Sequence, residues 1–594
     1  GERKVRKKPK RFAMMASICG IGWLSLMVGT AMAWQRHHET VQRLWNELQE
    51  KETTLDLSDP SMIQKYCDQK LDHFDPQNTK TWCQRFLTNA NFKKPGGPAF
   101  ICIDGEDYPW LSGRRPYTMV CNNMVQLAKE FGAIMLAVEH RYYGGADFDG
   151  VPDFTTENLK YHTSRQALAD LNQFWGWISP QLPASEVVVF GGSYPGSLSA
   201  WARKLYPESF RASVASSAPL LAQANFVGYN DVVASALTAS SVGGSPECLA
   251  TYSKGHAELK EMMKTAEGRR AVEKKFNLCG YNPLDDENNI AYWAGQDGIV
   301  ATIPQYNNAI CEHTNCNMKL FCGNLSIMSK STVSAIDALQ LMFDFQNQEN
   351  ARGQPRGQPA PECTDASYAK YVDGMKRTEK VSGTDPKAGD QLRRLWTFQT
   401  CNEFGWYQTC ESGSNCPYTQ GFNTIHWALD ICNLLFDMSP GDVLHNIDKT
   451  NQFYGGAAYP GATYTVFTNG EVDPWHWEST LVGEDPTVDA IFVKGASHCE
   501  WMHAVTPGMP GMLIEAKKAI QNKIASWLPM AAKDTTPEAT KQVKPKAETK
   551  DPQPAKDAKE KPTKAEMPKA NKLNKFLLAT ESEITSHLQV RTEL

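Results

Sequence analysis

Residues 187–196 constrain the fold of this chain more than any other segment. They read Val-Val-Val-Phe-Gly-Gly-Ser-Tyr-Pro-Gly. The four apolar residues predict a buried strand, and the glycines permit a tight turn. Residues 197–203 continue at helical spacing, and Pro207 ends the helix. The segment therefore predicts a strand that turns sharply into a helix, with Ser193 at the apex.

Two further residues make this serine a candidate nucleophile. A serine hydroxyl reacts poorly until a base takes its proton, and the base needs a carboxylate to orient it. Asp473 follows the strand-like residues 463–468, and His498 follows the strand-like residues 490–494. In α/β-hydrolases the triad occurs in the order Ser, Asp, His, at the carboxyl ends of strands. Taken singly, the three are also explained as a Gly/Ser turn, a turn residue before proline and an ordinary loop histidine.

Short motifs recur from about residue 64 to residue 529. They are LDHF at 71–74, GGP at 96–98, EHRYYG at 139–144, ASSAP at 215–219, FQTCNEFG at 398–405, NGEVDPW at 469–475 and GASH at 495–498. These motifs resemble the family of serine peptidases that cleave next to proline, which includes prolyl carboxypeptidase and dipeptidyl peptidase 2. The chain is most similar to the thymus-specific branch of that family. By matching position, the resemblance implies that Ser193 is the nucleophile, Asp473 the orienting acid and His498 the base.

The oxyanion site departs from the family pattern at two places. Pro195 stands where the family has a small residue, and a proline disfavours the α conformation of Tyr194 but leaves its oxyanion-binding N–H intact. Residues 104–107 read Asp-Gly-Glu-Asp where the family resembles Gly-Gly-Glu-Gly. We expect the second oxyanion N–H from Gly105 or Glu106. The added carboxylates either weaken oxyanion stabilisation or bind the N-terminal ammonium of a substrate.

Aromatic residues supply the candidates for a substrate pocket. A proline-selective site needs a small, rigid, apolar slot, and family resemblance makes Trp475 the first candidate for its wall. Tyr194 is a second candidate, and for both residues the alternative is core packing. Glu403 either meets a charged substrate terminus or closes a structural hydrogen-bond network, and we favour the network.

The two ends of the chain differ in composition from its middle. Residues 1–12 are basic and 13–34 are uncharged and mostly apolar, which predicts a cytoplasmic flank and a transmembrane signal-anchor. A cleaved signal peptide is the alternative. Residues 531–594 are rich in Lys, Glu, Pro and Ala and predict a disordered tail.

Between these ends we expect a stalk and a two-part catalytic domain. The resemblance implies a hydrolase core that a mostly helical cap interrupts, and the cap would limit access to the ends of peptide chains. The expected bounds are 35–57 for the stalk, 58–219 and 396–530 for the core, and 220–395 for the cap, with cap helices at 257–276 and 329–345.

The cysteines indicate an oxidising compartment. The chain has 16 cysteines without paired C-x-x-C motifs, which favours disulfides over a zinc site. Cys19 lies in the apolar N-terminal segment, and the fifteen others are an odd number, so we expect at least one thiol to stay free or to pair between chains. We also expect a glycosylation acceptor at Asn324. Local disulfides are expected among Cys311, Cys316 and Cys322, and among Cys401, Cys410, Cys416 and Cys432.

The sequence as a whole predicts an α/β protein with an α/β-hydrolase core, a helical cap, an N-terminal transmembrane segment and a disordered C-terminal tail. The expected activity is that of a secretory-pathway serine exopeptidase acting on proline-containing peptides, without metal or cofactor. It would be anchored as a single-pass protein, or secreted or lysosomal if the N-terminal segment is cleaved. A net charge of −5 gives no reason to expect nucleic acid. The alternatives are a weak or inactive peptide-binding protein and an esterase. Aminodipeptidase and carboxypeptidase action are both left open, as is the oligomeric state.

Overall fold

The computed structural model describes residues 63–106, 121, 123–144, 150–295, 304–352, 362–382, 385–503, 505 and 508–528. The predicted cytoplasmic flank, membrane segment and stalk lie outside these residues, as does the predicted C-terminal tail. None of the helices in this part of the chain is long and apolar enough to cross a bilayer.

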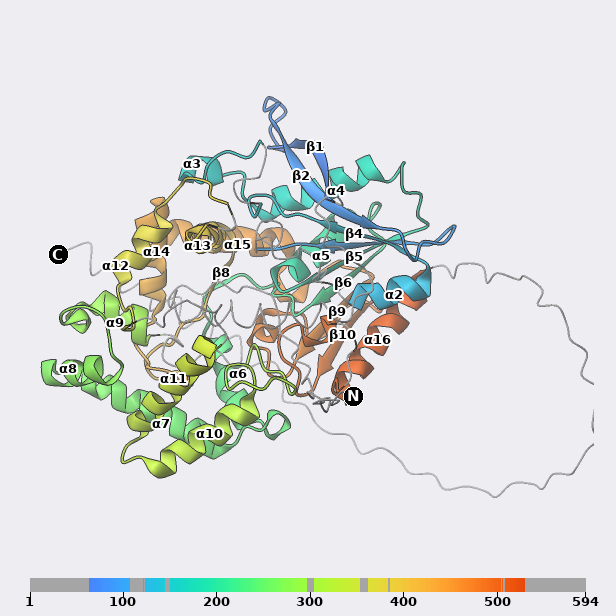
Figure 1. Ribbon diagram of the computed structural model, residues 1–594. Coiled ribbons are helices and arrows are strands. Elements are labelled where there is room, and N and C mark those ends of the chain that lie inside the picture. The colour runs from blue at the N-terminus through green and yellow to red at the C-terminus, as the bar shows by residue number, and fades with distance from the viewer. Residues whose placement is uncertain are drawn as a thin grey trace, which may run out of the picture. The chain divides into compact units, whose positions relative to one another are not determined.

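A sheet of eight strands forms the centre of the fold (Figure 1). Its spatial order is β1-β2-β4-β3-β5-β6-β9-β10. β2 runs antiparallel to both of its neighbours, and the strands from β4 to β10 are parallel. The strand bounds are β1 (Gln64–Lys70), β2 (Thr81–Asn89), β3 (Ala99–Ile103), β4 (Ile134–Val138), β5 (Val187–Gly192), β6 (Ala212–Ser216), β9 (Thr465–Gly470) and β10 (Val488–Val493).

Helices cover both faces of this sheet, which explains why β3, β4 and the first four residues of β5 are continuous apolar runs. In β5, Val187 and Val189 face the core beneath α4 (Ser164–Ile178) and α5 (Tyr194–Leu205). Val188 and Phe190 belong to the other core, together with residues of α2 (Asn123–Phe131) and α16 (Gly511–Trp527). The alternation follows from the two-residue period of a strand. The core is therefore an α/β core, a mixed sheet with helices packed on both faces.

A long helical insert separates β6 from β9. Figure 1 shows most of its helices on the left of the view, to one side of the sheet. The insert also contains β7 (Gln223–Asn225), which pairs in parallel with β8 (Gly405–Tyr407). Its helices are α6 (Val227–Thr238), α7 (Pro246–Met263), α8 (Ala266–Lys275), α9 (Glu287–Ala294), α10 (Met318–Ser331), α11 (Ala335–Arg352), α12 (Tyr368–Met375), α13 (Ala388–Gln399), a π-helix (Thr400–Phe404), α14 (Ile425–Phe436) and α15 (Pro440–Tyr454).

Short helical turns complete the described elements. They are α3 (Thr156–Leu159) and the 3-10 turns Ser240–Val242, Pro283–Asp285, Gly456–Ala458, Pro474–Glu478 and Glu500–Met502.

The insert differs from the sequence expectations in three details. The predicted cap boundary at residue 395 falls inside α13, and the sheet resumes only at β9. The helix expected at 257–276 is two helices, because the Thr265 side chain accepts from the N–H of Gly268 and caps the start of α8. The helix expected at 329–345 is likewise divided between α10 and α11.

Seven disulfides link cysteines of the described residues, and Cys499 is the free thiol among them. Cys322, the third cysteine of the first expected group, instead bonds the distant Cys248, because α10 packs against α7. The local pairs Cys311–Cys316, Cys401–Cys432 and Cys410–Cys416 agree with the expected groups. The other three are Cys67–Cys83, Cys102–Cys121 and Cys279–Cys363.

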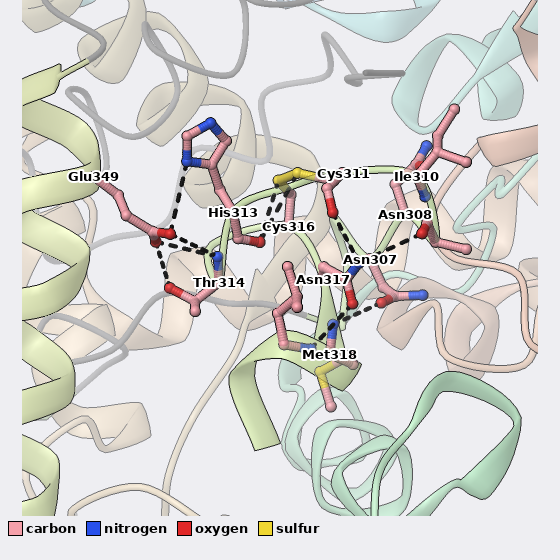
Figure 2. Close-up of a disulfide and its surroundings, with 12 residues drawn as sticks. Asn307, Asn308, Ile310, Cys311, His313, Thr314, Cys316, Asn317, Met318 and Glu349 are labelled. Carbon is pink, nitrogen blue, oxygen red and sulfur yellow. Dashed lines mark hydrogen bonds and ion pairs between the residues drawn. A yellow bond between two sulfur atoms is a disulfide. The ribbon is translucent and has the colours of Figure 1, made fainter. Parts of the chain in front are cut away.

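The small Cys311–Cys316 loop is fixed from two sides (Figure 2). On one side, the backbone N–H and the hydroxyl of Thr314 donate to the carboxylate of Glu349 on α11. On the other side, the side chain of Asn307 accepts from the N–H of Met318 at the start of α10. The loop therefore connects two helices of the insert.

A buried ion pair joins the segment that follows β4 to helix α4. Arg141 follows β4, and its Nε and Nη2 donate to the two carboxylate oxygens of Asp170 at 2.6 and 2.7 Å. The guanidinium also donates to the carbonyls of Leu71 (3.0 Å) and Tyr161 (2.7 Å). His73 Nε2 lies 2.7 Å from Asp170 Oδ1. The hydrogen bonds satisfy both buried ions, which is the condition under which such a pair is tolerated.

Replacing Arg141 with methionine should lower the free energy of unfolding by about 3–5 kcal/mol, because Asp170 is then left buried without its counter-ion. Denaturant titration followed by far-UV circular dichroism measures the change. The Arg141→Met/Asp170→Leu double variant should lose less than the sum of the two single variants. A loss of under about 1 kcal/mol in Arg141→Met would contradict this role.

Candidate active site

Ser193 occupies a strained turn between β5 and α5. Its φ is +61° and its ψ is −134°, a conformation that residues other than glycine rarely adopt. The Ser193 N–H donates to the Ser216 carbonyl at 2.9 Å. A Cβ on Gly191 would lie 2.0 Å from the Pro195 carbonyl oxygen, and one on Gly192 would lie 2.4 Å from Met502 Sδ. The turn can therefore approach its neighbours this closely only with glycine at both positions.

Pro195 is accommodated by its place in α5. It is the second residue of the helix, within the first turn, where backbone N–H groups have no partner inside the helix. Tyr194 is helical despite the proline that follows it. Its N–H therefore remains at the helix N-terminus beside Ser193, as an oxyanion donor requires.

Asp473 and His498 lie at the carboxyl ends of two neighbouring parallel strands, β9 and β10. His498 Nδ1 lies 2.8 Å from Asp473 Oδ1, and the same oxygen accepts from the N–H of Trp475 at 3.0 Å. Both side chains are fully buried. His498 Nε2 has no hydrogen-bond partner within the described ranges. Burial opposes the charged ring, but the Asp473 carboxylate and the sulfur of Cys499 hold the pKa of His498 above its usual value.

Gly105 and Glu106 follow β3, which pairs in parallel with β5. The loop therefore starts at the same edge of the sheet as Ser193. Glu106 is buried. Burial raises the pKa of the Tyr194 phenol, and the negative charge of Glu403 and the nearby Tyr454 add to the shift, with Glu106 making the smallest contribution. Asp107 lies outside the described residues.

The side chain of Tyr194 belongs to a buried polar network. Its hydroxyl lies 2.9 Å from His140 Nε2 and accepts from Gln399 Nε2 at 3.0 Å. Gln399 Oε1 in turn accepts from the hydroxyl of Tyr143 at 2.6 Å. Burial lowers the pKa of His140 to about 4, so its ring is neutral near pH 7 and can accept from Tyr194. The Tyr194 side chain is therefore packed in the core, in contact with His140 and Gln399. Core packing was the alternative to a role as a pocket wall.

His140 and Gln399 are the partners of Tyr194 that sequence reasoning missed. Both lie in motifs that carried the family resemblance. His140 lies 54 positions before Tyr194, and Gln399 lies 205 positions after it. Sequence patterns report on neighbours within a short window, so they do not indicate that both side chains contact the Tyr194 hydroxyl.

Glu403 lies in the π-helix and binds the first residue of α4. Its carboxylate accepts from the backbone N–H of Ser164 at 2.9 Å and from the Ser164 hydroxyl at 2.6 Å. That hydroxyl is also 2.8 Å from the hydroxyl of Tyr454. Burial raises the pKa of Glu403 to about 7, although the hydrogen bonds from Ser164 oppose the shift. The arrangement matches the network interpretation of this residue.

Trp475 lies in a group of aromatic rings beside His498. Its ring centroid is 6.3 Å from that of His498, 5.6 Å from Phe226, 5.7 Å from Tyr229 and 5.9 Å from Trp406. Phe226 and Tyr229 lie at the start of α6, so the helical insert supplies part of this group. Sequence reasoning missed these two residues, since about 250 positions separate them from Trp475.

Asn324 lies within α10. Its side-chain nitrogen, the atom that would carry a glycan, donates to the Leu320 carbonyl at 2.8 Å. Glycosylation at this residue stays a prediction.

The geometry suits acyl transfer. The buried Asp473 carboxylate orients His498 through its Nδ1. The other ring nitrogen, Nε2, has no hydrogen-bond partner among the described residues. A serine on a strained turn and a helix N-terminus lie at the same sheet edge. Such a site can activate a hydroxyl and stabilise an oxyanion without further groups.

Known proteins match most of this chain. The family model described as serine carboxypeptidase S28 matches residues 69–520. Thymus-specific serine protease of Mus musculus is 33% identical over 470 residues, which cover 78% of this chain and 87% of that protein. Lysosomal Pro-X carboxypeptidase of Homo sapiens is 25% identical over 446 residues, covering 73% and 82%. Among solved structures, epoxide hydrolase A from Mycobacterium thermoresistibile aligns with a TM-score of 0.29 and 12% identity, covering 78% of this chain and 98% of its own.

Replacing Glu403 with glutamine should change how stability depends on pH. The raised pKa means that folding favours the protonated carboxyl, so its contribution is full below about pH 4.5 and is lost as the pH rises through about 7. The wild type should therefore lose up to about 3 kcal/mol of unfolding free energy relative to Glu403→Gln between pH 4.5 and 8.

Denaturant titrations of the two proteins across that pH range measure the difference. Glu208→Gln, at an exposed residue, serves as the control for the substitution itself. A wild-type curve parallel to that of Glu403→Gln would contradict the assignment.

Proposed function

The chain belongs to the serine carboxypeptidase S28 family and is a serine-type peptidase, and from this premise we propose that Ser193, Asp473 and His498 form its catalytic triad and that it cleaves peptides next to proline. The observation that carries the proposal is the buried 2.8 Å contact between His498 and Asp473 at the sheet edge that bears the strained Ser193.

The chemistry follows from these three side chains. His498 Nε2 takes the proton of the Ser193 hydroxyl as the oxygen attacks the scissile carbonyl. Asp473 holds the Nδ1–H tautomer and stabilises the imidazolium that forms. The tetrahedral oxyanion is bound by the N–H of Tyr194 and by an N–H of Gly105 or Glu106. His498 then protonates the leaving amine, and a water molecule repeats the steps on the acyl-enzyme.

The preference for proline is supported by the rings around Trp475. Proline is a compact apolar ring and, within a chain, has no N–H that needs a partner. Trp475, Phe226 and Tyr229 offer rigid apolar surfaces near His498, where the residue before the scissile bond would lie. Lysosomal Pro-X carboxypeptidase, which is named for a proline beside the bond it cleaves, is 25% identical to this chain over 446 residues.

The helical insert supports action at chain ends. Its residues Phe226 and Tyr229 contact Trp475, and the backbone N–H of His498 donates to the carbonyl of Gln305 at 3.2 Å. Because residues of the insert contact Trp475 and His498, the insert would restrict access by internal segments of a folded substrate. We include exopeptidase action in the proposal on this ground.

The proposal also includes a secretory-pathway location. Seven disulfides fit an oxidising compartment. Anchoring through residues 13–34 is supported by their apolar composition and basic flank. Retention of the full-length protein in the membrane fraction after carbonate washing tests the anchor, and release into the wash contradicts it.

The purified protein should hydrolyse an N-blocked peptide ending in Pro-Xaa, or a free-amine Xaa-Pro fluorogenic amide, faster than the matched alanine substrate. Ser193→Ala should lower turnover by at least about 1,000-fold and abolish labelling by a fluorophosphonate. The first substrate reports carboxypeptidase action and the second dipeptidyl peptidase action, each followed by fluorescence or mass spectrometry.

Three outcomes would contradict the proposal. Equal turnover by Ser193→Ala would remove this residue as the nucleophile. Absence of both turnover and labelling in the wild type would favour a peptide-binding protein. Cleavage of matched esters but not of amides would favour an esterase.

Replacing Trp475 with alanine should lower the preference for proline over alanine by about 10-fold in kcat/KM, because one wall of the proposed slot is lost. Trp477→Ala is the matched control, since Trp477 lies in the same turn but is partly exposed. Steady-state kinetics on the paired substrates measure both variants. Equal loss for the two substrates would contradict a role in proline selection.

A further inference from the structure

The ASSAP motif at residues 215–219 has no role in the mechanism described above. It lies at the carboxyl end of β6, between β5, which leads to Ser193, and β9, which leads to Asp473. The side chains of Ser216 and Ser217 are completely buried. A buried hydroxyl is retained at little cost only where it is hydrogen-bonded, so the partners of these two serines are informative.

Ser216 contacts two segments of the candidate active site. One is the turn at residues 191–195, called here the nucleophile turn, and the other is the loop at residues 494–503, called here the histidine loop. Its carbonyl accepts the Ser193 N–H at 2.9 Å and lies 3.8 Å from the Cys499 sulfur. Its hydroxyl accepts from Trp501 Nε1 at 3.0 Å. Trp501 lies three residues after His498. One residue therefore bonds the backbone of the nucleophile and a side chain of the histidine loop.

Ser217 makes the bond nearest to the base. Its hydroxyl accepts the backbone N–H of Cys499, the residue after His498, at 2.9 Å. Its own N–H donates to the carbonyl of Thr468 in β9 at 2.7 Å. Ser217 and Cys499 both have left-handed backbone conformations, with φ of +46° and +58°. Cys499 directly precedes the 3-10 turn Glu500–Met502, and the Ser217 hydroxyl holds the peptide group between His498 and Cys499 at the start of that turn.

We propose that Ser216 and Ser217 are positioning residues that hold the histidine loop in register with the nucleophile turn, with the Ser217 hydroxyl setting the direction of the His498 imidazole. The inference rests on the proposed triad. Ser217 touches neither substrate nor the reacting atoms. It acts through the Cys499 N–H, which loses its partner in a buried place when the hydroxyl is removed.

The kinetic consequence follows from the geometry of proton transfer. Ser193 and His498 lie on different loops, and proton transfer between them needs both at hydrogen-bond distance. A displacement of about 1 Å at such a site can cost about 100-fold in rate. Substrate binding by the rings around Trp475 does not involve Ser217, so the loss should fall on kcat rather than on KM.

The test compares three variants of the full-length protein. Ser217→Ala and Ser217→Gly both remove the hydroxyl and leave the Cys499 N–H without its partner. Because glycine adopts a positive φ without steric cost, Ser217→Gly should lose less thermal stability than Ser217→Ala and stay folded. Both should lower kcat about 10- to 100-fold, leave KM within about 2-fold, and slow fluorophosphonate labelling of Ser193 in parallel with kcat.

Ser213→Ala is the matched control. Ser213 is a buried serine of the same strand, and its hydroxyl bonds Ser199 at 3.1 Å. Ser213→Ala should retain kcat and the labelling rate of the wild type, even if its melting temperature falls.

The outcomes separate this inference from the proposed function. If the wild type neither labels nor cleaves, the triad itself fails. If the wild type is active and Ser217→Gly is folded with an unchanged kcat, or if Ser213→Ala loses as much activity as Ser217→Ala, the positioning role is wrong. A loss that appears in KM alone would also overturn it.

Discussion

Steric exclusion at the turn between β5 and α5 determines how the loops around Ser193 are packed. No side chain fits at Gly191, because the carbonyl of Pro195 occupies the place of a Cβ. At Gly192 the same space is filled by sulfur atoms of Met502 and Cys499, both from the histidine loop. The loop that carries the base therefore packs directly against the strand that carries the nucleophile. This close approach also allows Ser217, directly after β6, to bond both the histidine loop and β9.

Buried polar groups surround this turn on several sides, and they are paired in different ways. On one side the Tyr194 hydroxyl connects the neutral ring of His140 to the amide of Gln399. Farther out, Glu403 caps α4 through Ser164. Polar networks of this kind fix a unique arrangement only when their members are satisfied. They fix the orientation of the residue after the nucleophile without contributing a reacting atom.

The sequence predicted the parts of this site that depend on local pattern. The strand-turn-helix at Ser193, and strands directly before Asp473 and His498, are recognisable because strands and tight turns have short-range signatures. Long-range contacts lacked such signatures. The Cys248–Cys322 disulfide, the rings of Phe226 and Tyr229 beside Trp475, and the return of the sheet only at Thr465 all depend on how the helical insert packs. The spacing of apolar residues within a short segment does not indicate how distant segments pack.

Cys499 has a consequence for how the molecule keeps its covalent framework. It is the one described cysteine outside a disulfide, and its sulfur is enclosed beneath Gly192. Thiol–disulfide exchange needs a thiolate that can reach a disulfide sulfur. A chain that has not yet closed the nucleophile turn still presents a thiol able to rearrange its disulfides. Closure of the turn buries that thiol, so assembly of the catalytic region also protects the native disulfide pairing from exchange with Cys499.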